Sequence, residues 1–342
     1  MLLQGPRRRL LGAGRPVHGP AGLRRAPAGA TVRPADGRGT AARPASRLRA
    51  WAELLRVSAL VTVPGDALAG AAATGERPTR GTGLAMGASL CLYAAGMALN
   101  DWADQNEDAT CRPHRPLPSG RIRPGTALAA SAGLTAAGLA LARQAGREAA
   151  RTAAVLAATV WAYDLGLKRT KAGPAVMTAA RCLDLLLGAA ATSRSGTRAA
   201  LGPAAALGAH TFAVTMVSRH EVLGGSRTAP LAALGTTAVV GIVTSRRRGL
   251  GRRRSRSPEG PTQAGLAAGL AAGFAATVAG PLIRAVLDPS PARTRQAVGG
   301  GIRAMIPLQA ALAARDGSVG AAAAIIALAP AARRLSRRVS PT

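Results

Sequence analysis

The sequence predicts an all-α protein that crosses a membrane as a bundle of about nine helices. Hydrophobic residues make up 48% of its 342 residues but aromatic residues only 2%, so a large soluble β-core is not expected. Long uncharged segments alternate with short charged ones, and alternation with a period of two residues is almost absent. This pattern is typical of proteins that span a membrane several times.

Composition divides the chain into three regions. Residues 1–50 are rich in Arg, Pro, Gly and Ala and contain one acid, Asp36. They lack the apolar core of a secretory signal peptide, so we expect a disordered basic extension, with an organelle transit peptide as the alternative. Residues 51–335 form the predicted transmembrane domain, and residues 336–342 form a basic tail. The three cysteines lie far apart and show neither metal-site nor disulfide spacing.

Nine apolar stretches are expected to span the membrane. They cover residues 57–75, 81–100, 126–142, 152–163, 172–193, 199–218, 228–245, 262–283 and 317–332. A weaker helix at 305–314 is expected only to lie against the bundle. Gly and Ala at helical spacing would let these helices approach one another closely.

The loops after the second, fourth and sixth spans must share one face of the membrane. They cover residues 101–124, 164–171 and 219–227, and the first two are rich in basic residues. The positive-inside rule makes this face cytoplasmic, so we expect an integral protein of the cell's inner membrane with its site facing the cytoplasm. The Arg-rich segment 246–256 would lie outside and conflicts with this orientation, although not with the shared face.

The formal net charge of +30 raises the question of nucleic acid binding. The arginines gather at the two ends and in one loop, and no aromatic residues are interleaved with them to stack on bases. We therefore expect contact with anionic membrane lipid and no nucleic acid partner.

Three aspartates, Asp101, Asp104 and Asp108, follow directly after the second span. At 100° per residue they would project from one face of a helix, over roughly 10 Å of its length. Such closely spaced carboxylates repel one another, and oxygen ligands of this kind suit Mg²⁺ that bridges to a phosphate. Asn100 adds a neutral oxygen at the same edge. A solvated acidic helix end is the alternative interpretation.

Basic residues suited to phosphate lie on the same predicted face. Arg112 and Arg115 follow the aspartates in a proline-rich turn. Lys168 and Lys171, the only lysines in the chain, flank Arg169 in the second loop. Carboxylates holding Mg²⁺ opposite such a cluster would bind a diphosphate, and the membrane setting implies a lipid tail. A loop that only fixes topology is the alternative.

These motifs resemble those of a known family. Asn100-Asp101-x-x-Asp104-x-x-x-Asp108, followed by Arg-Pro-Leu-Pro-Ser-Gly at 115–120, looks like the first aspartate-rich motif of the UbiA superfamily of intramembrane prenyltransferases. The YDLGLKR segment at 163–169 is similar to the family's Tyr…Lys-Arg loop. The resemblance implies a nine-helix bundle with a central cavity. It also implies Mg²⁺-dependent ionisation of an isoprenyl diphosphate and transfer of the prenyl group to a small, often aromatic acceptor.

The resemblance also suggests roles for individual residues. The implied catalytic set is Asp101, Asp104, Asp108, Lys168 and Arg169, and the diphosphate contacts are Asn100, Arg112, Arg115, Lys168, Arg169 and Arg219. Most members carry a second DxxxD motif after the sixth helix, whereas this chain has Ser-Arg-His-Glu at 218–221. Only Glu221 could therefore join the three aspartates as a metal ligand, and this pattern resembles the EboC-like branch.

Charged residues inside predicted spans are candidates for an acceptor pocket. Asp66 lies in the first span, and Arg181 and Asp184 lie in the fifth. They should face the bundle interior because exposing a charge to lipid is costly. Tyr163 is the fourth candidate. Arg181 and Asp184 are three residues apart and could instead only neutralise each other. Asp66 has no local partner, so it could orient an acceptor hydroxyl or pair with Arg181.

Three functions remain open from the sequence. The first is a membrane prenyltransferase that transfers an alkyl (non-methyl) group from an isoprenyl diphosphate with Mg²⁺ as cofactor. The second is a non-catalytic carrier or transport component that keeps the fold and binds the lipid diphosphate. The third, least favoured, is a soluble all-α terpene synthase.

Overall fold

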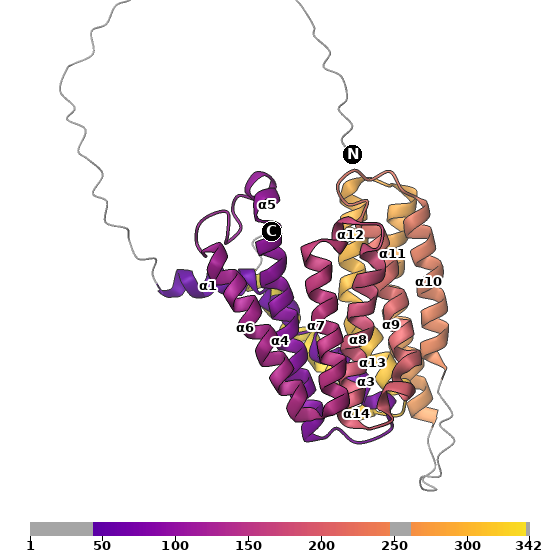
Figure 1. The fold of residues 1–342 in the computed structure, drawn as a ribbon. Helices are drawn as coiled ribbons and strands as arrows, with labels where there is room; N and C mark the ends of the chain where they lie inside the picture. Colours follow the sequence, from indigo (N-terminus) through magenta and orange to yellow (C-terminus); the bar gives the residue numbers. More distant parts are fainter. Residues whose placement is uncertain (1–43, 247–260, 340–342) are drawn as a thin grey trace, which may run out of the picture. The chain divides into compact units, whose positions relative to one another are not determined.

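The computed structural model describes residues 44–246 and 261–339, and every regular element within them is helical (Figure 1). The helices are α1 (Pro44–Leu54), α2 (Val57–Leu60), α3 (Pro64–Ala73), α4 (Arg80–Ala103), α5 (Gln105–Cys111), α6 (Pro124–Ala145), α7 (Arg147–Leu165), α8 (Gly173–Thr192), α9 (Gly196–Ser218), α10 (Thr228–Ser245), α11 (Pro261–Leu287), α12 (Pro291–Arg303), α13 (Met305–Arg315) and α14 (Val319–Val339), with a short 3₁₀ turn, η1 (Leu167–Arg169), after α7. The predicted helical fold class is confirmed.

Seven helices or helix pairs in the described part of the chain are long and apolar enough to cross a membrane. They are α4, α6, α8, α9, α10, most of α11, and α12 taken together with α13. The remaining predicted spans are also helical, but α3 and α7 are too short or too polar for this set, and the apolar part of α14 is short. Apolar helices of this number and length indicate an integral membrane protein.

The helix predicted at 305–314 has a larger part in the bundle than the sequence suggested. It is α13, and its side chains Leu308, Gln309 and Leu312 are completely buried. The helix packs against α3, α11 and α14. The expectation that it only lies against the bundle is therefore wrong, because Gln309 and flanking arginines make a central helix look polar in sequence.

Prolines and hydroxyl groups mark several helix starts. Pro64 opens α3 and divides the first predicted span, since a proline is tolerated in the first turn but interrupts a continuing helix. Thr79 caps α4 by accepting a hydrogen bond from the Thr82 amide. Arg56, just before α2, has φ 46° and ψ 53°, a left-handed conformation that turns the chain between α1 and α2.

Two predicted boundaries move in the structure. The helix α1 begins at Pro44, so the last seven residues of the predicted extension 1–50 are helical, and Ala50 is buried. The helix α14 continues to Val339, into the predicted tail 336–342. Residues 1–43, the rest of that tail and most of the Arg-rich segment 246–256 lie outside the described residues.

Close helix contacts depend on glycine. A Cβ added at Gly188 of α8 would overlap the carbonyl oxygen of Ala67 in α3, and one added at Gly70 would overlap the carbonyl oxygen of Leu185. The two backbones therefore touch, as small residues allow in membrane helices. This contact places Asp66 of α3 beside α8.

We predict that Gly188→Val separates α3 from α8 and lowers the unfolding temperature of the detergent-solubilised protein. Overpacking of this kind costs about 1–3 kcal/mol. Gly133→Val in α6 is the matched control, since no atom lies within 4 Å of a Cβ added there. Equal unfolding temperatures for the two variants would contradict the backbone contact.

Candidate active site

The three loops predicted to share a membrane face contact one another. Lys168 Nζ lies 2.7 Å from Asp104 Oδ2, and Arg169 Nη2 lies 2.9 Å from Asp104 Oδ1. From the third loop, Arg219 donates to the carbonyl oxygen of Thr170 at 3.0 Å. The shared face inferred from span order is therefore confirmed.

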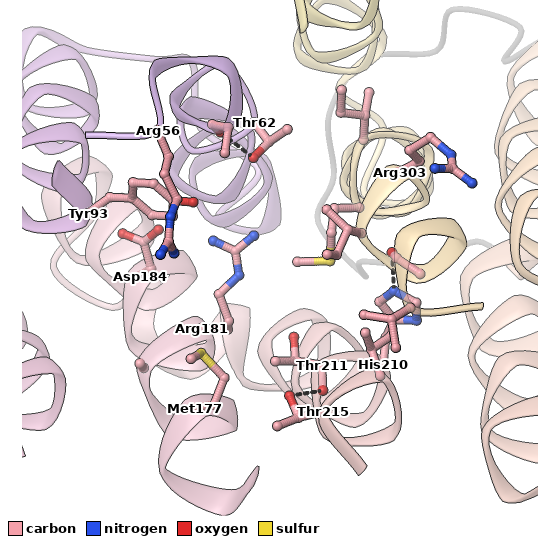
Figure 2. A pocket seen from close by; sticks show the side chains of 18 of the residues that line it. Arg56, Thr62, Tyr93, Met177, Arg181, Asp184, His210, Thr211, Thr215 and Arg303 are labelled. Atoms are coloured by element: carbon pink, nitrogen blue, oxygen red, sulfur yellow. Dashed lines mark hydrogen bonds between the residues drawn. The ribbon is translucent and has the colours of Figure 1, made fainter. Parts of the chain in front are cut away.

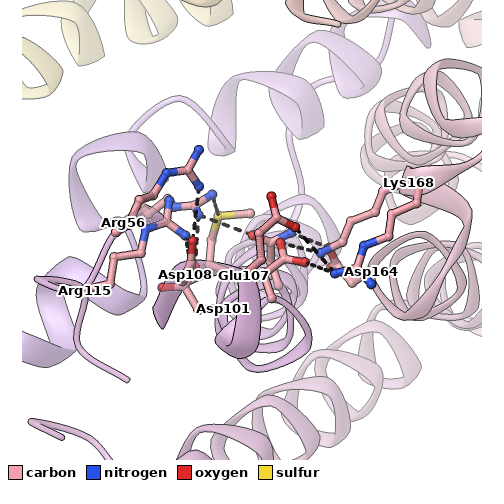
Figure 3. Close-up of polar contacts among 12 residues, drawn as sticks. Arg56, Asp101, Glu107, Asp108, Arg115, Asp164 and Lys168 are labelled. Carbon is pink, nitrogen blue, oxygen red and sulfur yellow. Dashed lines mark hydrogen bonds and ion pairs between the residues drawn. The ribbon is translucent and has the colours of Figure 1, made fainter. Parts of the chain in front are cut away.

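The three aspartates do not lie along one helix. The helix α4 ends at Ala103, Asp104 occupies its C-cap, and α5 begins at Gln105. Asp101 and Asp108 are thus on different helices, and the expectation of a single acidic helix face is wrong (Figure 3). The break separates the carboxylates into two groups.

The first group forms around Arg115. Its Nη1 atom lies 2.6 Å from Asp108 Oδ2 and 3.3 Å from Asp101 Oδ1. Arg56 Nη2 is 3.1 Å from the same Asp101 oxygen, and Arg112 Nη1 is 3.3 Å from Asp108 Oδ1. Asp101 and Asp108 are almost fully buried, so these three guanidinium groups offset the cost of desolvating their charge.

The second group joins Asp104 to the loop after α7. Besides its contacts with Lys168 and Arg169, this group includes Asp164, the penultimate residue of α7. Asp164 Oδ1 accepts a hydrogen bond from Asn100 Nδ2 at 2.9 Å and lies 3.8 Å from Lys168 Nζ. Figure 3 shows this group beside the one around Arg115.

Glu221, in the third loop, lies near Arg112 of the first group and forms no ion pair with the aspartates. Burial raises the pKa of its carboxyl group, and the nearby Arg295 and Arg112 partly offset that rise. Arg295 donates to its backbone oxygen at 3.3 Å. Among the residues that the structure describes, no three acidic, His or Cys side chains are grouped for one metal ion. The predicted four-residue metal set is therefore not assembled in this arrangement.

The donor atoms nevertheless fit Mg²⁺. The point where Asp101 and Asp108 converge is occupied by a single atom, Arg115 Nη1. Mg²⁺ in proteins commonly takes one or two carboxylates and completes its shell with phosphate oxygens and water. Two buried carboxylates and the Asn100 amide supply that chemistry if the guanidinium moves aside.

Below these loops lies a cavity of about 1,210 Å³ (Figure 2). Its mouth is lined by Asn100, Asp164 and Glu221, so the second charged group opens directly into it. Deeper in the cavity, Arg181 and Asp184 line it. A volume of this size is ample for a lipid chain together with a small molecule.

The predicted acceptor-pocket residues lie mainly in this deeper part. Arg181 Nη1 lies 2.7 Å from Asp66 Oδ2, and Gln309 Nε2 donates to Asp66 Oδ1 at 2.7 Å. Asp184 accepts a hydrogen bond from Ser89. The ion pair at Arg181 is therefore with Asp66 of α3, rather than with Asp184 of its own helix. Tyr163 lines the same cavity, whereas Asp66 sits behind its wall.

Sequence reasoning missed Arg56, Asp164, Ser89 and Gln309. Asp164 lies inside the YDLGLKR segment, four residues before Lys168, so the sequence did indicate that these two residues could interact. Ser89 and Gln309 gave none, because each interacts with a charge distant in sequence. Arg56 looked like an ordinary flanking charge, but it lies at the left-handed turn before α2 and pairs with Asp101.

We predict that Arg115→Met destabilises the protein by about 3 kcal/mol, because it leaves two buried carboxylates short of a cation. Millimolar Mg²⁺ should restore more of the unfolding temperature in this variant than it adds to the wild type. Arg151→Met, which removes an exposed pair with Glu148, is the control and should cost at most about 1 kcal/mol. Equal effects of the two substitutions would contradict the role of Arg115.

Solved structures share this fold. The apo structure of a UbiA homologue from Aeropyrum pernix matches with a TM-score of 0.58 at 17% identity, over 74% of this chain and 96% of that one. A UbiA homologue from Archaeoglobus fulgidus bound to DMAPP and Mg²⁺ matches with a TM-score of 0.53 at 17% identity, over 75% and 98% of the two chains. At these identities the likeness concerns the fold.

Sequence comparison identifies relatives over part of the chain. Digeranylgeranylglyceryl phosphate synthase of Methanopyrus kandleri is 35% identical over 128 residues, which is 36% of this chain and 45% of that protein. The enzyme of the same name from Halobacterium salinarum is 37% identical over 155 residues, 45% and 55% of the two chains. This chain thus spans about half the length of the curated relatives it matches. The model of the UbiA prenyltransferase family matches residues 58–250, more than half of the chain, and the protein therefore belongs to the UbiA prenyltransferase family.

Proposed function

We propose that this protein is an integral-membrane prenyltransferase. It transfers an isoprenyl group, an alkyl (non-methyl) group, from an isoprenyl diphosphate to a small acceptor. The observation that carries the proposal is the mouth of the cavity, where buried carboxylates and a basic loop meet above a space large enough for a lipid chain. Family membership and the Mg²⁺- and DMAPP-bound relative support the same chemistry.

The carboxylates and the basic residues have separate roles in this proposal. Asp101 and Asp108, with Asp104 and Asn100, would hold Mg²⁺, which supplies Lewis-acid neutralisation of the diphosphate when bound. When the substrate binds, the Lys168 ammonium group leaves the Asp104 carboxylate and contacts an oxygen of the diphosphate instead. The basic residues that bind the diphosphate are Arg112, Arg115, Lys168, Arg169 and Arg219, and they stabilise the charge that grows on the leaving group.

The cavity wall supplies the second requirement, exclusion of water. Ionisation of an allylic diphosphate leaves a carbocation that water would quench. Apolar side chains such as Leu156, Val160 and Met177 line the cavity below the mouth. A prenyl cation formed there would meet the acceptor before it meets solvent.

The acceptor class has two independent pointers. The family resemblance implies a small aromatic acceptor, and the names of the archaeal relatives contain a glyceryl phosphate.

The charged loops 101–124 and 164–171 favour a cytoplasmic mouth in the inner membrane, with residues 51–335 as the transmembrane domain that carries out the transfer. Glu221, the one acidic residue where most members of the family carry a second DxxxD motif, would act as a further metal ligand at the diphosphate site.

A carrier that binds the diphosphate without turnover is the second candidate. The third loop favours it, because Glu221 is the one acidic residue between residues 218 and 227 and no second carboxylate cluster is present there. Release of diphosphate discriminates between the two functions.

We predict that the purified protein releases diphosphate from labelled geranyl diphosphate only with Mg²⁺ and a suitable acceptor. Asp104→Asn should lower the rate by about 100-fold or more, as expected when a group that acts in the transition state is lost. Glu148→Gln, at an exposed carboxylate on α7, should keep the wild-type rate.

The outcomes separate the candidates. Binding of geranyl diphosphate without release, over a panel of acceptors, would establish the carrier. Unchanged release in Asp104→Asn would remove the aspartates from the reaction. Recovery of the protein in the supernatant without detergent would contradict a membrane enzyme of either kind.

A further inference from the structure

The charged group around Asp104 holds a basic nitrogen between two carboxylates. Lys168 Nζ lies 2.7 Å from Asp104 Oδ2 and 3.8 Å from Asp164 Oδ1. This arrangement repeats the one around Arg115, whose Nη1 atom lies between two other buried aspartates. A point between carboxylate oxygens that already holds a cation also favours a metal ion. The group around Asp104 is therefore a candidate for a metal position of its own.

The two groups at the mouth differ in their balance of charge. The group around Arg115 pairs three guanidinium groups with two carboxylates. The ion pairs of the other group join three carboxylates to two cations. The carboxylates are those of Asp104, Asp164 and Glu107, and the cations are Lys168 and Arg169. Figure 3 shows Arg56 and Arg115 on one side of the site and Lys168 and Asp164 on the other.

Two neighbouring arginines leave this excess of carboxylate in place. Arg56 acts on Asp164 electrostatically, but its own ion pair is with Asp101. Arg219 donates to the carbonyl oxygen of Thr170 and forms no ion pair within the described residues. In the proposed reaction the Lys168 ammonium group also leaves for the diphosphate. The carboxylates of this group therefore lose a cation when the substrate arrives, and a divalent ion would replace it.

Asp164 has one oxygen without a partner at the edge of the cavity. The residue is 5% exposed, and its Oδ1 atom accepts a hydrogen bond from Asn100 Nδ2 at 2.9 Å. Its Oδ2 atom has no hydrogen bond to the part of the chain that the structure describes. A Cβ added at Gly96 would lie 3.7 Å from Oδ2, and both residues line the cavity. A nearly buried carboxylate oxygen of this kind is costly unless a ligand satisfies it.

We propose that Asp164 and Asp104 bind a Mg²⁺ ion of their own when the substrate displaces Lys168, beside the ion proposed between the two aspartates at Arg115. This inference rests on the proposed diphosphate chemistry and adds a ligand from outside the aspartate motifs of the family. Mg²⁺ commonly takes one or two carboxylates, so phosphate oxygens and water would complete its shell. Asn100 orients Asp164 for this role, because its hydrogen bond to Oδ1 leaves Oδ2 for the metal.

Counting bound Mn²⁺ tests this assignment without turnover. Mn²⁺ takes the same oxygen ligands as Mg²⁺, and electron paramagnetic resonance measures the ion that stays free. The full-length protein in detergent is saturated with the unreactive geranyl S-thiolodiphosphate and titrated with Mn²⁺. We predict two bound ions per wild-type protein. Asp164→Asn should weaken one of them by about tenfold or more. Glu107→Gln, at an exposed carboxylate of the same group, should bind both ions as the wild type does.

A second variant keeps the test decisive if Asp164→Asn fails to fold. Lys168→Met removes the ammonium group from between Asp104 and Asp164. Without thiolodiphosphate, this variant should bind one Mn²⁺ more tightly than the wild type does, because the two carboxylates are left without their cation. An unchanged affinity for Mn²⁺ would overturn the proposed position.

The remaining outcomes separate this inference from the proposed function. Absence of thiolodiphosphate binding in the wild type would overturn the diphosphate chemistry itself. Thiolodiphosphate binding with only one Mn²⁺, or two ions held equally well by Asp164→Asn, would overturn only the additional metal position. An equal loss in Glu107→Gln would do the same, since it would assign the effect to the charge of the group rather than to a ligand.

Discussion

The arrangement of the site depends on the neutralisation of buried carboxylates by arginines and a lysine from other segments. Asp101 and Asp108 are almost fully buried, and both meet one atom of Arg115, so neither could keep its charge at this depth alone. The same requirement ties Asp104 to Lys168 across two loops. Because these pairs join different elements, charge neutralisation fixes the loops at the mouth and gathers there the groups that we propose to bind a diphosphate.

The helix bundle below the mouth holds a second buried ion pair and the cavity. Glycine contacts between α3 and α8 bring Asp66 within reach of Arg181, so a charge pair is placed inside an otherwise apolar bundle. Arg181 and Asp184 line one part of the cavity, and apolar side chains such as Leu156 and Val160 line another.

Much of this organisation follows from hydropathy and span order. The apolar stretches became helices, and the order of spans placed the three loops on one face, where Lys168 meets Asp104. The break at Asp104 did not follow, because neither Gly nor Pro interrupts residues 101–108. The pairing of Asp66 with Arg181 was one of the alternatives left open, because both charges lie inside predicted spans, but periodicity alone could not choose it over a pair of Arg181 with Asp184. The same holds for α13, whose buried Gln309 makes a central helix look peripheral.

The central claim is that the mouth of the cavity binds diphosphate through Mg²⁺, and calorimetry tests it most directly. Geranyl diphosphate is titrated into the detergent-solubilised protein with Mg²⁺ and, separately, with EDTA. We predict saturable binding in Mg²⁺ and its loss in EDTA, because the carboxylates at the mouth repel a bare diphosphate. Equal affinity under the two conditions, or no binding in either, would contradict it.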